Sequence, residues 1–307
     1  MQERTTAPHV RIDTKPVPNV HYREVALFSI LAYALSWLWW GIRLYPYLGS
    51  ADLLGSVGTM DIVIGDFGPL IAAVIMRLFV SREGLKGSLG LWRSWKYFLV
   101  ALIAPAIFIG VVVGFSHLTG LGRFVWRGDI PLWVYYPAMP LVGLIVAIFV
   151  FGEEYGWRGY LLPRVLPLGE IKATVVVGVI WAGWHLPLLL IGFNYPGQSP
   201  WLAIPVFTFT VLFLSFPFTW FYVETRGSAL LAAILHGVLN AYGDSMTAAD
   251  VMRGNPLVVG SAGLIVGAFL MIITLVVYGI FKRPSRREDV GQLVRPQSDG
   301  TWRDWLR

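Results

Sequence analysis

Two adjacent glutamates at the end of an apolar run are the first residues in this chain that could do chemistry. The segment FVFGEEYGWRGYLLPRV, at 149–165, contains Glu153 and Glu154, and Arg158 follows four residues after the second. Residues four apart on a helix share a face, so Glu154 and Arg158 can form an ion pair. Glu153 is turned about 100° away from Glu154. We therefore expect a fixed Glu154–Arg158 pair and a Glu153 that is free to act.

Two later segments each carry a histidine in an apolar helix. GVIWAGWHLPLLL contains His185, with Trp181 one turn before it, and ILHGVLNAYG contains His236 and Asn240, which are four apart and project side by side. Taken singly, each segment has an ordinary explanation: a polar helix end for the glutamates, a satisfied structural histidine, and interhelical hydrogen bonds. Ionisable groups inside membrane spans are rare, however, and together these three segments indicate a functional site.

This set of side chains suits hydrolysis of a peptide bond. A glutamate with a histidine can deprotonate water, and a histidine with an asparagine amide can donate hydrogen bonds to a developing oxyanion. The same groups could instead bind zinc through His185, His236 and one carboxylate, for which Glu153 is the candidate. The sequence has no HExxH segment, the spacing most typical of zinc proteases. Both mechanisms stay open.

The composition indicates a membrane protein. Of the 307 residues, 56% are hydrophobic and only 14% are charged, and the mean hydropathy is +0.64. A soluble domain of this length needs more polar surface. Cysteine is absent, which excludes thiolate nucleophiles, disulfides and cysteine metal ligands. The net charge of +6 is modest and no nucleic-acid motif is present, so no nucleic-acid partner is expected.

The apolar runs predict an all-α fold, a polytopic membrane bundle of about eight transmembrane helices. Each run is long enough to cross the hydrocarbon core. The fourth should continue as helix toward Leu162 and stop before Pro163. Asp66, in the second, could line a cavity or cap a helix break beside Gly65 and Gly68, and we favour the break. The expected spans are about 25–44, 62–80, 97–116, 132–152, 173–191, 202–223, 228–243 and 257–281.

The basic residues predict the orientation of the bundle. With the N-terminus inside, most lysines and arginines fall in inner segments. The outer loops hold only Arg43, Arg123, Arg127 and Arg253. Because cytoplasmic loops carry the excess of positive charge, both termini are expected in the cytoplasm. The predicted organisation is a cytoplasmic N-terminal arm at 1–24, a transmembrane domain at 25–281 and a basic cytoplasmic tail at 282–307.

The three segments, in this order, resemble the motifs of a known family. EEYGWR, WAGWH and HGVLN are similar to the EExxxR, FxxxH and HxxxN or HxxxD pattern of the CPBP family of intramembrane proteases. That family includes CAAX prenyl endopeptidases of the Rce1 type and the bacteriocin-processing or immunity-associated proteins called Abi. The resemblance covers a motif core at about 140–243. Trp181 stands where the pattern has phenylalanine, so the shape of the pocket is expected to differ.

The resemblance implies a role for each motif residue. Glu153 would be the general base that activates water with His185, while His236 and Asn240 would stabilise the oxyanion. The remaining residues would support the site: Glu154, Arg158 and Trp181. Family members are commonly named metalloproteases, yet a metal-free, glutamate-dependent mechanism is the other interpretation of the same residues. Zinc is therefore a possible cofactor, held by Glu153, His185 and His236.

We predict an intramembrane endopeptidase of the CAAX type, in the cell membrane of a prokaryote. Its cavity would open toward the cytoplasm, and its partners would be the lipid bilayer and a membrane-associated protein or peptide substrate. The alternatives are a non-catalytic membrane protein of the immunity or scaffold type, and an ion- or proton-coupled transporter that uses the same polar cluster. Neutralising Glu153 separates them: a transporter should lose transport without ever showing proteolysis, and a scaffold should tolerate the change.

Overall fold

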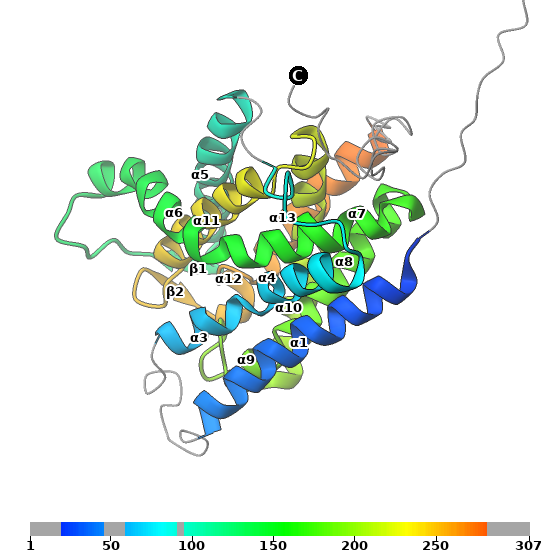
Figure 1. Ribbon diagram of the computed structural model, residues 1–307. Helices are drawn as coiled ribbons and strands as arrows, with labels where there is room; N and C mark the ends of the chain where they lie inside the picture. Colours follow the sequence, from blue (N-terminus) through cyan, green and yellow to red (C-terminus); the bar gives the residue numbers. More distant parts are fainter. Residues whose placement is uncertain (1–19, 46–58, 91–94, 281–307) are drawn as a thin grey trace, which may run out of the picture.

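The computed structural model describes residues 20–45, 59–90 and 95–280, which form a bundle of helices (Figure 1). The predicted tail at 282–307 lies outside the described residues, as does the predicted N-terminal arm except for 20–24. The elements in chain order are α1 (Tyr22–Leu44), α3 (Thr59–Asp66), α4 (Gly68–Ile75), the π-helix η2 (Met76–Val80), α5 (Trp95–Leu118), β1 (Gly122–Phe124), α6 (Leu132–Glu154), the π-helix η3 (Tyr155–Leu161), α7 (Leu162–Val165), the 3-10 turn η4 (Leu166–Leu168), α8 (Glu170–Trp184), α9 (Leu186–Leu190), α10 (Pro200–Glu224), α11 (Ala229–Met246), β2 (Met252–Gly254), α12 (Pro256–Val259), α13 (Leu264–Leu275) and the π-helix η5 (Val276–Ile280).

The predicted fold class, a polytopic helical membrane bundle, is confirmed, although the count of eight spans is not. Across the described ranges, six helical segments are long and apolar enough to cross a membrane: 22–44, 60–80, 95–118, 132–168, 200–224 and 256–280. Helix α8 has 15 residues, about 22 Å of helix, which is shorter than the hydrocarbon core. Helix α11 carries polar side chains at three successive turns, His236, Asn240 and Asp244, which lower its hydropathy.

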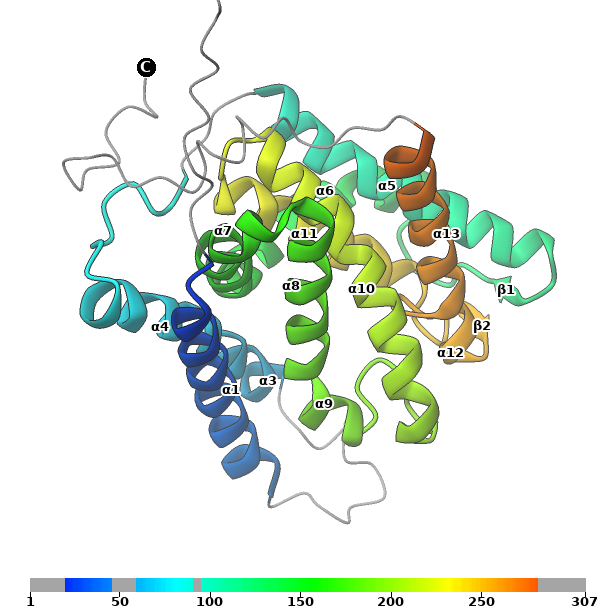
Figure 2. The ribbon, with the colours of Figure 1, turned by 90° about the vertical axis from the view of Figure 1, so that its right-hand side faces the viewer.

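Three groups of helices meet near the end of α6. Helix α6 packs along α11 more extensively than any other pair of described elements, and α5 packs on α11 as well. Helix α10 lies between α8 and α13, and the three form a row (Figure 2). Helix α1 packs on α4, which in turn contacts α6 and η3. The three sequence motifs lie on α6 with η3, on α8 and on α11, so this meeting point brings them together.

Glycines allow α6 and α11 to approach closely. A Cβ at Gly237 would lie 2.4 Å from both the carbonyl oxygen of Gly143 and the amide nitrogen of Ala147. A Cβ at Gly143 would lie 2.5 Å from the Cα of Val238. These neighbours are backbone atoms, so no side-chain movement could relieve the clash. Small residues of this kind are typical of helix contacts in membranes, and here they set the height of α11 against the last turns of α6.

The helix break expected beside Gly65 and Gly68 is present between α3 and α4. The Ser36 hydroxyl donates a 2.8 Å hydrogen bond to the Gly65 carbonyl, and a Cβ at Gly68 would lie 2.1 Å from the same hydroxyl oxygen. A Cβ at Gly152 of α6 would lie 3.3 Å from the carbonyl oxygen of Asp66. The break therefore packs against the helix end that carries the glutamates, and it brings Asp66 close to them.

The prediction that the fourth helix stops before Pro163 was wrong. After Glu154 the chain continues through the wider turns of η3 into α7, and Pro163 lies in the first turn of α7. The N–H groups in the first turn of a helix have no acceptor within that helix, so the missing N–H of proline costs no hydrogen bond there. The π-helical segment moves the proline from a helix interior to a tolerated position.

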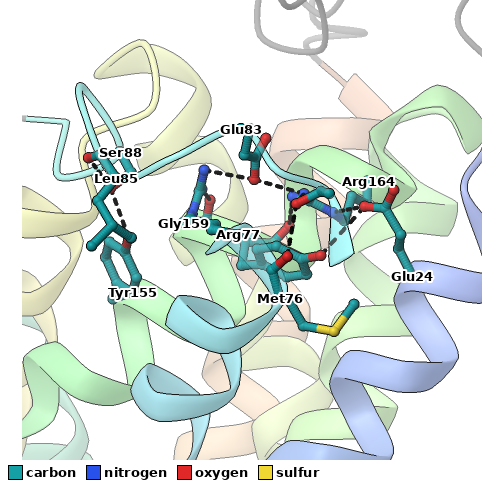
Figure 3. Close-up of polar contacts among 11 residues, drawn as sticks. Glu24, Met76, Arg77, Glu83, Leu85, Ser88, Tyr155, Gly159 and Arg164 are labelled. Atoms are coloured by element: carbon teal, nitrogen blue, oxygen red, sulfur yellow. Dashed lines mark hydrogen bonds and ion pairs between the residues drawn. The ribbon is translucent and has the colours of Figure 1, made fainter. Parts of the chain in front are cut away.

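A network of charged side chains holds η3 from the side of α1 (Figure 3). Arg77 donates through Nη2 to the Gly159 carbonyl at 2.7 Å and through Nη1 to Glu83 at 2.8 Å. Arg164 binds the same Glu83 oxygen at 2.8 Å and reaches Glu24 of α1 at 2.7 Å. Two arginines and two glutamates balance each other in this network. It anchors the segment that directly follows the glutamate pair.

Gly237→Ala should destabilise the protein by about 1 to 3 kcal/mol, because the added methyl group must push α11 away from the backbone of α6. Thermal unfolding in detergent measures this as a lowered melting temperature. Gly114→Ala in α5 is the matched control, since a Cβ there meets nothing within 4 Å. Alanine is the better helix former, so the control should be neutral or slightly stabilising. Equal melting temperatures for the two variants would show that the α6–α11 contact is not tight.

Candidate active site

The two glutamates are both buried in the last turn of α6, and Glu154 is the more tightly bound. Its side chain is completely buried, and Oε1 accepts hydrogen bonds from Arg158 Nη1 at 2.7 Å and from His236 Nδ1 at 2.9 Å. The pair with Arg158 is the one expected from the four-residue spacing. The bond from His236 was not expected, and it joins α11 to the end of α6. A carboxylate can only accept, so Nδ1 of His236 carries the proton in this contact.

Arg158 is fully buried and lies between two aromatic rings. Its Cζ is 4.2 Å from the ring centroid of Trp181 and 4.5 Å from that of Phe218. Its Nε and Nη2 have no hydrogen-bond partner in the part of the chain that the structure describes, nor has Oε2 of Glu154. The two ring faces and one carboxylate oxygen therefore compensate the buried charge. Because this compensation is incomplete, the loss of any one partner should be costly.

Glu153 is not as free as its spacing suggested. Its side chain is buried, and Oε2 accepts a 2.9 Å hydrogen bond from Nε1 of Trp181 on α8. Its other oxygen, Oε1, makes no hydrogen bond within the described ranges and is not fully enclosed by the surrounding atoms. Asp66 lies close enough for its charge to interact with that of Glu153. One oxygen of Glu153 is thus held and the other is available.

His185 and Asn240 occupy the edges of the cluster. His185 caps the end of α8, and its Nδ1 lies 2.9 Å from the carbonyl oxygen of Trp181. A carbonyl accepts, so Nδ1 carries the proton and Nε2 is the accepting nitrogen of the neutral ring. Asn240 lies one turn after His236 on α11 and is half-buried, and its amide makes no hydrogen bond within the described part of the chain. The position of Asn240 is therefore set by the helix backbone and not by a hydrogen bond of its side chain.

Pro187 explains why α8 ends at this point. It lies in the first turn of α9, where its ring interrupts the hydrogen-bond ladder of α8, and His185 occupies the junction between the two helices. The backbone of His185 still accepts a 3.0 Å hydrogen bond from the Leu189 amide. The junction places His185 at the end of a rigid helix instead of within a continuous span.

The three residues that could have held zinc do not form a zinc site in this arrangement. In the described ranges, no group of three His, Asp or Glu side chains is close enough to hold a metal ion. Zinc in an enzyme takes three protein ligands at about 2 Å. The hydrogen bonds of His236, His185 and Glu153 would each leave one ligand atom free, namely Nε2 of the two histidines and Oε1 of Glu153. The three side chains are nevertheless not grouped closely enough to share one ion. The residues present therefore do not fit a three-ligand centre.

Two further contacts of the site also escaped the sequence patterns. The bond from Trp181 to Glu153 could have been suspected, because a buried indole N–H usually has a partner. The approach of Asp66 to Glu153 had a weaker signal, a lone acid in the apolar segment GDFGPLIAAVI. Both contacts join helices far apart in the chain, so no spacing rule reveals them.

The bundle of apolar helices and its buried polar cluster define an integral membrane protein with an intramembrane polar site. Residues 132–242 match the family model described as Rce1-like, type II CAAX prenyl endopeptidase Rce1-like. That stretch runs from the start of α6 into α11 and contains all three motifs. The resemblance of the motifs to this family is thereby confirmed for the region that builds the site.

A curated relative supports the same family. The CAAX prenyl protease 2 of Methanococcus maripaludis is 27% identical over 148 residues, which are 46% of this chain and 53% of that protein. The chain thus spans about half the length of the curated relative it matches. The orientation of the termini and the kind of cell membrane remain predictions.

Glu154→Gln should destabilise the protein by about 3 kcal/mol or more, because it removes the ion-pair partner of the fully buried Arg158. Thermal unfolding in detergent provides the measurement. Asp61→Asn is the matched control, since it also converts a paired carboxylate to an amide, but its partner Arg43 is 48% exposed. That change should cost about 1 kcal/mol or less. Equal losses would show that the buried pair contributes no more than the exposed one.

Proposed function

We propose that this protein is an intramembrane endopeptidase of the CAAX type, which hydrolyses a peptide bond of a membrane-associated substrate. The observation that carries the proposal is the state of Glu153: a buried carboxylate with one oxygen held and one available, beside a histidine that is fixed by a second carboxylate. This arrangement lies in the segment that matches the Rce1-like family.

In the first step, Glu153 acts as the general base. Its available oxygen, Oε1, takes a proton from a water molecule, whose oxygen attacks the carbonyl carbon of the scissile bond. His185 assists by accepting a hydrogen bond from this water through Nε2, because its Nδ1 proton is already donated to a carbonyl. The proton held by Glu153 then passes to the nitrogen of the leaving amine as the C–N bond breaks.

In the same step, His236 and Asn240 stabilise the oxyanion. Nδ1–H of His236 is donated to Glu154, so a hydrogen bond from Nε2 to the oxyanion requires protons on both ring nitrogens. The Glu154 carboxylate accepts the Nδ1–H of His236, and Arg158 holds the same carboxylate oxygen in place. The half-buried amide of Asn240, one turn further along α11, supplies a second donor. Glu154, Arg158 and His236 therefore act as one unit.

The substrate is proposed to be a protein or peptide that reaches the site from the membrane. The curated relative is named for CAAX prenyl proteins, and this makes a prenylated C-terminal peptide the first substrate to try. The site lies at the end of α6, and the distribution of lysine and arginine predicts that this end is at the cytoplasmic side. A peptide anchored by its lipid in the inner leaflet would approach the site from that side.

Glu153→Gln should lower kcat at least about 100-fold, because the amide cannot accept the proton of the attacking water. The assay uses purified protein in liposomes with a farnesylated CAAX-type peptide and the same peptide without its lipid, and follows products by mass spectrometry. Glu224→Gln is the control: this half-buried glutamate of α10 binds Tyr97, and its rate should stay within about twofold of the wild type.

Cleavage by both Glu153→Gln and the wild type at similar rates would mean that the base is wrongly assigned. If the wild-type protein cleaves neither peptide but carries an ion flux that Glu153→Gln abolishes, the transporter alternative is correct. Cleavage of the farnesylated peptide alone would define the substrate class as lipidated proteins.

A further inference from the structure

Trp181 contacts Glu153, Arg158 and both histidines of the candidate site. Its Nε1 donates to Glu153 at 2.9 Å, and its ring covers Arg158 with 4.2 Å between Cζ and the ring centroid. Its ring centroid lies 5.6 Å from that of His236, edge to face, and its carbonyl accepts from Nδ1 of His185 at 2.9 Å. Only 2% of the residue is exposed. No other described residue links all these groups.

The hydrogen bond to Glu153 matters because oppositely charged groups lie close to that carboxylate. Arg158 and His236 attract it, while Glu154 and Asp66 repel it. A carboxylate that turned to pair with a cation would have both oxygens occupied and would be a poor base. The indole N–H is a neutral donor, so it can fix one oxygen without adding a positive charge beside the base.

We propose that Trp181 positions both water-activating groups of this protein. Its side chain holds Oε2 of Glu153, so that Oε1 stays available for water, and its carbonyl fixes the ring of His185 with Nε2 as the accepting nitrogen. The proposal rests on the assignment of Glu153 as the base. Any residue at position 181 would supply the backbone carbonyl that holds His185. The N–H that holds Glu153 belongs to the tryptophan side chain, and phenylalanine, which the family pattern has at this position, lacks it.

The decisive change removes the N–H and keeps the ring. Trp181→Phe does so approximately, and replacement of Trp181 by 3-benzothienylalanine does so with the indole shape retained. Both variants should lower kcat about 10-fold or more, with KM within about twofold, because the base is misplaced while substrate binding is not altered. The second variant separates the hydrogen bond from packing, since it fills nearly the same volume as the indole and removes the N–H alone.

Trp157→Phe on η3 is the matched control. Trp157 is fully buried, but its Nε1 has no hydrogen-bond partner within the described ranges, and its ring packs on Phe28 and Trp184, so the change alters packing alone. The melting temperature of this variant should fall while its kcat stays within about threefold of the wild type, because no hydrogen bond of the site is lost. An equal fall of kcat in both tryptophan variants would overturn the positioning role.

A spectroscopic readout tests the hydrogen bond without activity. In protein with 15N-labelled indoles, the Nε1–H signal that Trp181→Phe removes should shift in Glu153→Gln, while the Trp157 signal should not. An unmoved signal would overturn the proposal. If the wild type is active and the kcat of the benzothienylalanine variant is unchanged, the positioning role alone is overturned. A wild type that cleaves no peptide, with the shift still present, would overturn the function of Glu153 as a base and leave the bond as a structural contact.

Discussion

The structure of the site depends on one buried ion pair, between Glu154 and Arg158, that His236 completes. Two charges without access to water are costly, and they remain stable only when their geometry and partners are nearly complete. Here the partners come from four different helices: the carboxylate from α6, the aromatic rings from α8 and α10, and the imidazole from α11. Each helix is thereby held in register by the need to balance these charges.

This pair also separates the tasks of the two adjacent glutamates. Glu154 is completely buried and binds Arg158 and His236 through Oε1, so it can orient and polarise but has no oxygen open to water. Glu153, one residue earlier on the helix, is turned toward Trp181 and keeps an available oxygen. The backbone supports the division of roles: the glycine contact between Gly143 and Gly237 sets α11 against α6, and the arginine network anchors η3 from the other side.

Contacts within one helix were predictable from the sequence, and contacts between helices were not. The Glu154–Arg158 pair follows from a four-residue spacing, and the break near Asp66 follows from its flanking glycines. The bonds from His236 to Glu154 and from Trp181 to Glu153 depend on how α8 and α11 rotate against α6, which no local pattern encodes. The end of the fourth helix was misjudged at Pro163 because a π-helical turn, which has no clear sequence signal, shifted the proline into a first turn.

The most direct test of this account is a double-mutant cycle on cleavage rates with Glu154→Gln, His236→Gln and the double variant. If Glu154 acts on catalysis through His236, the double variant should be about as slow as the slower single variant, because groups that work as a unit do not lose activity additively. If the losses in log kcat simply add, the two residues act independently, and the buried pair is not the interaction on which the site depends.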